Sequence, residues 1–177
     1  VALCVTCLVD QLFPEVGVGT VKLLRRAGCQ IDFPAEQTCC GQPFFNSGFR
    51  RQATDLARRT IDLFEPYKAV VLPSGSCTSM IRLEYTHLLE DEPAWRDRAR
   101  QLAAKTYELS DFLVNQIGWT PDRPAGQEKA PGQSITYHDS CHLLRTLGVR
   151  SQPRELLSSI HGLEFVEMAD SDRCCGF

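Results

Sequence analysis

The chain has 177 residues, 43% of them apolar and 23% charged, and a net charge of -3 at pH 7. This length suits one domain or two small ones, neither of which requires disulfides for stability. Lysine and arginine are scattered and form no basic face, so we expect no nucleic-acid partner. No apolar run approaches the roughly 20 residues of a membrane helix, and residues 1–9 lack the features of a signal peptide. We therefore expect a cytoplasmic protein without a membrane-spanning segment.

The first predicted elements alternate between strand and helix. Residues 1–5 form a short apolar run typical of a buried strand, and residues 16–27 have the pattern of a helix that ends at Gly28. Residues 30–33 predict a second strand before Pro34. The start of the chain is therefore expected to form a β-α-β unit.

The alternation continues along the chain. Residues 51–64 carry apolar side chains every three or four positions and predict an amphipathic helix packed on a sheet. Residues 69–72 predict a strand, residues 73–76 a turn, and Cys77 the start of a helix toward Leu89. A helical region is expected over residues 93–117.

Two similar sets of cysteines occur in the chain. Cys39-Cys40-Gly41 and Cys174-Cys175-Gly176 each follow a further cysteine, with 31 residues between Cys7 and Cys39 and 32 between Cys141 and Cys174. A nearly constant offset of this kind indicates duplication.

The duplication defines the expected domains. We predict a first repeat over residues 1–119, a linker rich in Pro and Gly over residues 120–133, and the start of a second repeat over residues 134–177. We expect the second repeat to continue past Phe177. The predicted fold is α/β, with two pseudo-symmetric halves of Rossmann-like parallel sheets flanked by helices and the cysteines at the strand ends.

The cysteines favour metal binding. In a reducing compartment they persist as thiols, and clustered thiols there indicate metal binding or catalysis. Cys7, Cys77 and Cys141 lie at predicted strand-to-helix junctions, where backbone N–H groups stabilise a thiolate or an anionic cofactor. Zinc sites usually use closely spaced Cys or His pairs, whereas these cysteines are spread over each half. The pattern therefore favours iron-sulfur ligation, with zinc as the alternative.

The candidate ligands are the repeated cysteines. One cluster is expected on Cys7, Cys39, Cys40 and Cys77, and a second on Cys141, Cys174 and Cys175. Cys4 is a further candidate, for which burial in the strand is an equal alternative, and Cys29 is expected in the core. His138 and His142 are candidates to donate hydrogen bonds to cluster sulfur, with packing or capping as the alternative.

Two other interpretations concern the same segments. His138-Asp139-Ser140-Cys141-His142 contains the base, carboxylate and thiol of a cysteine-nucleophile site, although neighbours in sequence need not meet in space. Arg50 and Arg145 follow cysteine motifs and are candidates to bind the carboxylate of a 2-hydroxy acid.

The chain resembles the cysteine-rich CCG-domain family, whose pattern is a cysteine, a long spacer, Cys-Cys-Gly, a second spacer and Cys-x-x-Cys. Its members include one of the subunits of heterodisulfide reductase and the iron-sulfur subunit of glycolate oxidase. The resemblance covers essentially the whole chain and is greatest to a branch that works in lactate oxidation. It extends beyond the cysteines to Cys7-Leu8-Val9-Asp10, Cys39-Cys40-Gly41-Gln42-Pro43, Asn46-Ser47-Gly48, Pro73-Ser74-Gly75-Ser76-Cys77 and Lys105-Thr106-Tyr107-Glu108-Leu109.

The resemblance implies an iron-sulfur subunit, without flavin, of an L-lactate dehydrogenase-type complex that converts lactate to pyruvate. It implies [4Fe-4S] or non-cubane clusters that carry electrons, and two partner proteins, one of them of ferredoxin type. The alternatives are a heterodisulfide-reductase-like or glycolate-oxidase-like iron-sulfur subunit, or a zinc-binding assembly subunit without a redox role.

The chain departs from the family pattern in two places. Met80 stands where the closing Cys-x-x-Cys of the first half would have its second cysteine, so a site with five thiolates requires Cys4 as a substitute. The closing pair of the second half is expected beyond Phe177, so the second ligand set is incomplete in this sequence.

Overall fold

The computed structural model describes residues 1–121, 133–174 and 176. The chain forms two compact units, Val1–Leu109 (the first unit) and Ser110–Phe177 (the second unit), each with its own parallel sheet. Most of the predicted linker over residues 120–133 lies outside the described residues, as does Cys175. The predicted boundaries of the two repeats stay a prediction.

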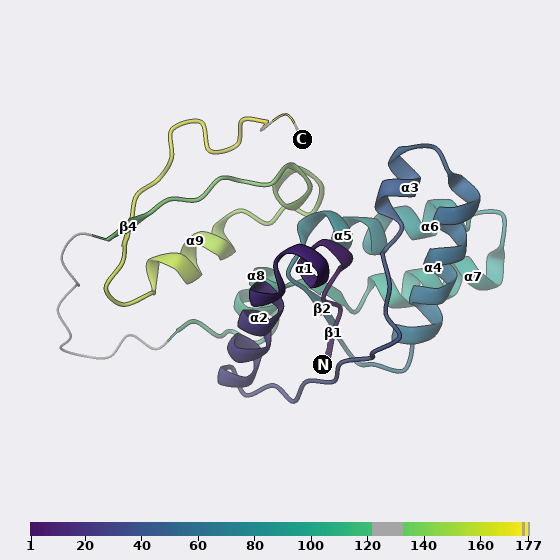
Figure 1. The fold of residues 1–177 in the computed structure, drawn as a ribbon, viewed down its shortest axis with the longest axis horizontal. Helices are drawn as coiled ribbons and strands as arrows, with labels where there is room; N and C mark the ends of the chain where they lie inside the picture. The colour runs from purple at the N-terminus through teal and green to yellow at the C-terminus, as the bar shows by residue number, and fades with distance from the viewer. Residues whose placement is uncertain (122–132, 175, 177) are drawn as a thin grey trace. The chain divides into compact units, whose positions relative to one another are not determined.

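A three-stranded parallel sheet organises the first unit (Figure 1). Its strands are β1 (Ala2–Leu3), β2 (Val70–Leu72) and β3 (Thr106–Glu108), hydrogen-bonded in that order. Asp32 adds a parallel bridge to Ala2 on the other side of β1. The chain therefore leaves β1 in both directions, first to Asp32 and later to β2. Such a reversal of strand order is a topological switch point, and open α/β sheets bind ligands there, at the carboxyl ends of the strands.

Helices lie on both sides of this sheet (Figure 1). Helices α1 (Cys7–Leu12) and α2 (Pro14–Arg26) follow β1, and α3 (Gln42–Asn46) and α4 (Arg50–Phe64) lead to β2. After β2 come α5 (Gly75–Ser79), the π-helix η1 (Met80–Glu84), α6 (Tyr85–Leu88) and α7 (Pro93–Ala103).

Apolar side chains of these elements form the core of the first unit. β2 is buried along its whole length, as expected for a parallel strand covered on both faces. Two of the predicted ligands, Cys40 and Cys77, belong to the core cluster. Its other members are Ala2, Cys4, Ala57, Ile61, Phe64, Val70, Leu72, Met80, Ile81, Tyr85, Leu89, Ala99 and Leu102.

Several predicted elements are confirmed. The strands expected within residues 1–5 and 69–72 correspond to β1 and β2, and the helices expected over residues 16–27 and 51–64 correspond to α2 and α4. The strand expected over residues 30–33 is reduced to the bridge at Asp32. The expected turn is shorter, because Ser74 caps α5 by accepting from the Cys77 N–H, so that this helix begins before Cys77.

The continuous helical region expected over residues 93–117 is wrong. Helix α7 ends at Ala103, and the chain forms β3 before α8 (Leu109–Asp111) and the π-helix η2 (Phe112–Gln116). Thr106 and Tyr107 have the β-branched and aromatic side chains that strands favour. The open edge of β2 supplies their hydrogen-bond partners, beginning with Val70 N to Lys105 O at 2.8 Å.

The second unit contains a smaller parallel pair. After η2 come β4 (Ser134–Ile135), the π-helix η3 (His142–Thr146), α9 (Ser151–Ser158) and β5 (Glu164–Phe165). β4 pairs with β5 between residues 30 positions apart, the separation that also joins Ala2 to Asp32 in the first unit. The α/β class is confirmed as a mixture of helices and small parallel sheets. Rossmann-like pseudo-symmetry of two whole halves stays a prediction.

None of the helices in the described part of the chain has the length and apolar character needed to cross a bilayer.

Candidate functional site

Four predicted ligands meet in the first unit, at the carboxyl ends of the strands. Cys7 begins α1 after β1, and Cys77 lies in α5 after β2. The sulfur atoms of Cys7 and Cys39 are 3.6 Å apart. The Cys40 thiol is hydrogen-bonded to those of Cys39 and Cys77. A chain of thiol contacts therefore runs from Cys7 through the doublet to Cys77.

The four thiols differ in exposure. Cys40 and Cys77 are buried, whereas Cys7 and Cys39 are half-buried, and all four are free thiols. A cavity of about 250 Å³ adjoins Cys7 and Cys39 and is also lined by Asp10. One end of the thiol chain thus faces an open cavity, and the other is packed in the core.

Hydrogen bonding separates the acidic thiols from the others. The bond with Cys40 lowers the pKa of Cys39 to about 5, and the Gly41 N–H, 3.4 Å from the Cys39 sulfur, acts in the same direction. The bond with Cys40 also lowers the pKa of Cys77 to about 7, with a further contribution from Ser74. Burial, followed by the bond to Cys39, raises the pKa of Cys7 to about 11. Cys39 and Cys77 are therefore the thiols that most readily adopt the thiolate form that binds metals.

Tyr85 supports the first doublet from the core. Its hydroxyl donates to the carbonyl oxygen of Cys40 at 2.8 Å, and the side chain is fully buried. Sequence reasoning missed this residue, because a tyrosine on the apolar face of a helix has no pattern that distinguishes support from packing.

The backbone before Cys7 is strained. Thr6 has φ 73° and ψ 149°, in a region used almost only by glycine, although its side chain is β-branched. Such a conformation costs on the order of 1–3 kcal/mol, and the surrounding packing must hold it. Thr6 is buried at 4% exposure, so the fold maintains this strain directly beside a candidate ligand.

Two further cysteines of the first unit lie outside the thiol chain. Cys4 is buried, and burial, with a smaller effect of Cys77, raises its pKa to about 12. Its role as a ligand stays a prediction. Cys29 is half-buried, and the expectation that it belongs to the core is wrong. Helix α2 ends at Arg26, and Gly28, at φ +82°, follows as its terminating glycine, so Cys29 lies beyond the helix and its buried face.

The second unit repeats part of this arrangement. Cys174 is exposed and hydrogen-bonded to the Cys141 thiol, as Cys39 is to Cys7. The Gly176 N–H lies 3.5 Å from the Cys174 sulfur, and Gly176 has φ +87°, the value also found at Gly41. The Gly176 N–H, and then Cys141, lower the pKa of Cys174.

Within residues 1–121, 133–174 and 176, no three His, Cys, Asp or Glu side chains are arranged to hold one metal ion. The thiols of the first unit instead form a row of pairwise contacts. In an iron-sulfur cluster the cysteine thiolates bind different iron atoms, so the donor set matches such a cluster in chemical type and number.

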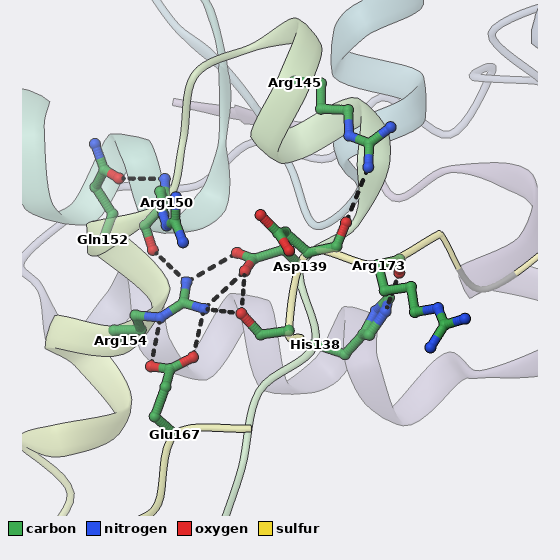
Figure 2. Close-up of polar contacts among 10 residues, drawn as sticks. His138, Asp139, Arg145, Arg150, Gln152, Arg154, Glu167 and Arg173 are labelled. Atoms are coloured by element: carbon green, nitrogen blue, oxygen red, sulfur yellow. Dashed lines mark hydrogen bonds and ion pairs between the residues drawn. The ribbon is translucent and has the colours of Figure 1, made fainter. Parts of the chain in front are cut away.

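The arrangement does not suit a cysteine-nucleophile site (Figure 2). The carboxylate of Asp139 accepts hydrogen bonds from Arg154 at 2.7 and 2.8 Å and from the Ser171 hydroxyl at 3.0 Å. Arg154 therefore engages the group that would orient a catalytic base. His138 places Nε2 2.8 Å from the carbonyl oxygen of Arg173. A hydrogen bond from His138 or His142 to cluster sulfur stays a prediction.

The two candidate arginines also have local partners. Arg145 donates to the carbonyl oxygen of Asp172 at 2.9 Å. The guanidinium of Arg50 lies over the Phe45 ring, 4.4 Å from its centre. Arg50 also lines a cavity of about 310 Å³, together with Glu90 and Asp91. These two acidic residues make that cavity unfavourable for a carboxylate.

Comparison with known protein families shows to which class of protein this chain belongs. A model of the cysteine-rich domain, named CCG, matches residues 1–82 and 135–177, which include both cysteine sets. The chain belongs to this family of cysteine-rich domain proteins.

Individual relatives narrow the comparison. The chain is 50% identical to lactate utilization protein A of Bacillus subtilis, over all of this chain and 72% of that protein. It is 48% identical to lactate utilization protein A of Halalkalibacterium halodurans, over all of this chain and 70% of that protein. The predicted resemblance to this branch of the family is confirmed. The similarity to these relatives supports a role in lactate utilization. The family match supports a cysteine-rich domain suited to a metal or cluster.

Proposed function

We propose that this protein is an iron-sulfur redox subunit of a system that oxidises L-lactate to pyruvate. One [4Fe-4S] or non-cubane cluster would be held by Cys7, Cys39, Cys40 and Cys77, and Cys141, Cys174 and Cys175 would contribute to another. The observation that carries the proposal is the meeting of four thiols, from three separate segments, at the switch point of the first sheet. The lactate part rests on similarity to relatives that are named for lactate utilization.

The donor set fits such a group by its chemistry. Iron-sulfur clusters are usually held by four cysteine thiolates, and the first unit supplies four thiols joined by successive pairwise contacts from Cys7 to Cys77. A cluster bound there would accept and release single electrons. Cys39 and Cys77 would bind as thiolates most readily, because hydrogen bonding lowers the pKa of both thiols.

The surrounding residues would control access to this centre. The core around Cys40 and Cys77 excludes water, and hydrophobic surroundings influence the potential of a redox centre. Cys7 and Cys39 border the 250 Å³ cavity and form the side from which an electron partner or solvent approaches.

Several parts of the proposal follow from family resemblance. We propose two partner proteins, one of ferredoxin type, as the routes by which electrons enter and leave. The chain would form the iron-sulfur part, without flavin, of an L-lactate dehydrogenase-type complex. The Rossmann-like pseudo-symmetric halves and the cytoplasmic location also belong to the proposal.

Metal content tests the cofactor. The protein is purified without oxygen, and iron, acid-labile sulfide and zinc per chain are measured together with an EPR spectrum. We expect iron and sulfide in similar amounts. Cys39→Ser should lose the iron and sulfide of the first cluster, whereas Cys29→Ser should lose none. Zinc alone, or no metal after anaerobic purification and attempted reconstitution, would contradict the redox proposal.

Growth tests the substrate. Deleting the gene should prevent growth on L-lactate as the carbon source and leave growth on glucose unchanged. Complementation with the wild-type gene should restore growth, whereas Cys39→Ser should not. Unimpaired growth on lactate, in a strain with no other lactate-oxidising system, would exclude the proposed pathway.

A further inference from the structure

Both units join the segment before the single cysteine to the segment before the doublet. In the first unit, the Val5 N–H, two residues before Cys7, donates to the side-chain oxygen of Gln37 at 2.8 Å. In the second unit, the Asp139 N–H, two residues before Cys141, donates to the backbone oxygen of Ser171 at 2.8 Å. The same two segments are therefore joined in each unit, but by different groups.

In the first unit one side chain makes the connection. Besides accepting from Val5, Gln37 donates from Nε2 to Pro34 O at 2.9 Å and to Leu3 O at 3.3 Å. The side chain is half-buried and lies two residues before Cys39. One amide group thus holds the end of β1 against the chain that leads to the doublet.

In the second unit an ion pair makes the connection (Figure 2). Arg154, on α9, donates to both carboxylate oxygens of Asp139 at 2.7 and 2.8 Å, to Glu167 at 2.8 Å and to the Ser171 hydroxyl at 3.1 Å. The Ser171 hydroxyl donates to Asp139 at 3.0 Å. The Asp139 side chain is 1% exposed and that of Arg154 is 16% exposed, so water screens this pair poorly.

Two further bonds join the same segments of the second unit. His138 Nε2 lies 2.8 Å from Arg173 O, and Arg145 donates to Asp172 O at 2.9 Å. The segments beside Cys141 and Cys174 are therefore connected through at least three neighbouring residue pairs.

We propose that Gln37 in the first unit, and Arg154 with Asp139 in the second, are positioning residues that hold the single cysteine against the first cysteine of the doublet. The proposal rests on the proposed function for what each pair binds. The geometric claim concerns only the separation between Cys7 and Cys39 and between Cys141 and Cys174.

The physical reason is the entropy of loop closure. More than 30 residues separate the members of each cysteine pair, so the chain must be restrained before two thiols can meet. An arginine fork adds orientation to attraction, because its two parallel bonds allow only a narrow range of angles to the carboxylate. Lysine keeps the charge but cannot reproduce this geometry.

Disulfide formation in the metal-free protein measures the separation within each pair. The full chain is incubated with oxidised glutathione. As two protein thiols form one S–S bond, the S–S bond of oxidised glutathione breaks, and the two glutathione molecules released carry the two electrons and the two protons. Samples are quenched with acid, and the Cys7–Cys39 and Cys141–Cys174 disulfides are quantified by peptide mass spectrometry. The variants are Gln37→Leu, Arg154→Lys and, as a matched control, Arg98→Lys, because Arg98 also pairs with two carboxylates, those of Asp62 and Glu65.

We expect each variant to affect its own pair. Gln37→Leu should slow formation of the Cys7–Cys39 disulfide about tenfold and leave the rate for Cys141–Cys174 unchanged. Arg154→Lys should slow formation of the Cys141–Cys174 disulfide about tenfold and leave the rate for Cys7–Cys39 unchanged. The reason is that the effective concentration of one thiol near the other depends steeply on their alignment. Arg98→Lys should change neither rate. Unchanged rates, or equal slowing of both pairs in each variant, would overturn the proposal.

Two additions distinguish the ways in which the test can fail. Ser171→Ala removes only the hydroxyl contacts and should slow Cys141–Cys174 by a smaller factor, so it replaces Arg154→Lys if that variant does not fold by circular dichroism. Iron and sulfide uptake is measured on the same proteins. A wild-type protein that takes up no iron contradicts the proposed function, whereas the pair-specific rates still decide the positioning.

Discussion

At the scale of single residues, the doublet Cys39-Cys40 depends on groups far from it in sequence. Tyr85 lies 45 positions from Cys40 and donates to its carbonyl oxygen. Thr6 holds a strained conformation beside Cys7, and Gly41 supplies a positive φ after the doublet. Each of these residues restrains the backbone at or next to a cysteine of the site without itself being a candidate ligand.

Tyr85→Phe should destabilise the first unit while keeping its packing. The change leaves the buried Cys40 carbonyl without this donor, which costs about 1–3 kcal/mol in free energy of unfolding. Urea unfolding measures the loss. Tyr107→Phe is the control, because its exposed hydroxyl bond to Ala104 O at 3.2 Å should contribute about 0.5 kcal/mol or less. Similar losses in the two variants would contradict a special role for Tyr85.

Gly41→Ala should cost more stability than Gly176→Ala. Both glycines have φ +87°, so at both positions alanine must adopt a left-handed backbone conformation, which lowers the free energy of unfolding by about 1–2 kcal/mol. At Gly41 a Cβ would also lie 3.3 Å from the Ala53 carbonyl oxygen, whereas at Gly176 it would meet nothing within 4 Å among the described residues. Thermal unfolding compares the variants, and we expect a further loss of about 1 kcal/mol for Gly41→Ala. An equal effect at both sites would show that contact with α4 is unimportant.

At the scale of elements, helix α2 lies very close to the chain before Cys7. Gly17 is buried on this helix, and a Cβ there would lie 2.9 Å from Cγ2 of Val5. Val5 is β-branched and buried, so it cannot easily move aside. The absence of a side chain at Gly17 therefore permits this packing.

Gly17→Ala and Gly19→Ala should have opposite effects on stability. Gly19 is on the same helix with nothing within 4 Å of a Cβ, so alanine there should add about 0.5–1 kcal/mol through helix propensity. At Gly17, overpacking against Val5 should cost about 1–3 kcal/mol. Urea unfolding measures both changes. A stabilising Gly17→Ala would mean that the chain before Cys7 moves aside at little cost.

The elements also show where pattern reasoning succeeds. Helix α4 follows the predicted period, with Ala53, Ala57, Thr60, Ile61 and Phe64 buried, because one long apolar face requires one long helix. β3 has only three residues at the edge of the sheet, and its partner, the central strand β2, is far away in sequence. A helix carries its hydrogen bonds within itself, whereas a short strand depends on a neighbour that sequence pattern does not reveal.

At the scale of the whole molecule, removing the proposed clusters should destabilise the protein. Metal that binds only the folded chain adds its binding free energy to stability. Chelating iron from protein purified without oxygen should lower the midpoint of thermal unfolding by about 5–10 °C, measured by calorimetry. Cys39→Ser lacks one ligand and should show a smaller shift under the same treatment. An unchanged midpoint in the wild-type protein would argue that the thiols hold no tightly bound metal.

The sequence by itself determined the two similar cysteine sets, the family and the α/β class. These are visible because a repeated motif and an apolar period are local properties of the chain. Only the tertiary structure decided which residues support the thiols. Tyr85 at Cys40, Gln37 at Val5 and Arg154 at Asp139 act across 15 to 45 positions of sequence. Their roles depend on which backbone groups folding buries, and therefore on which hydrogen bonds water no longer supplies.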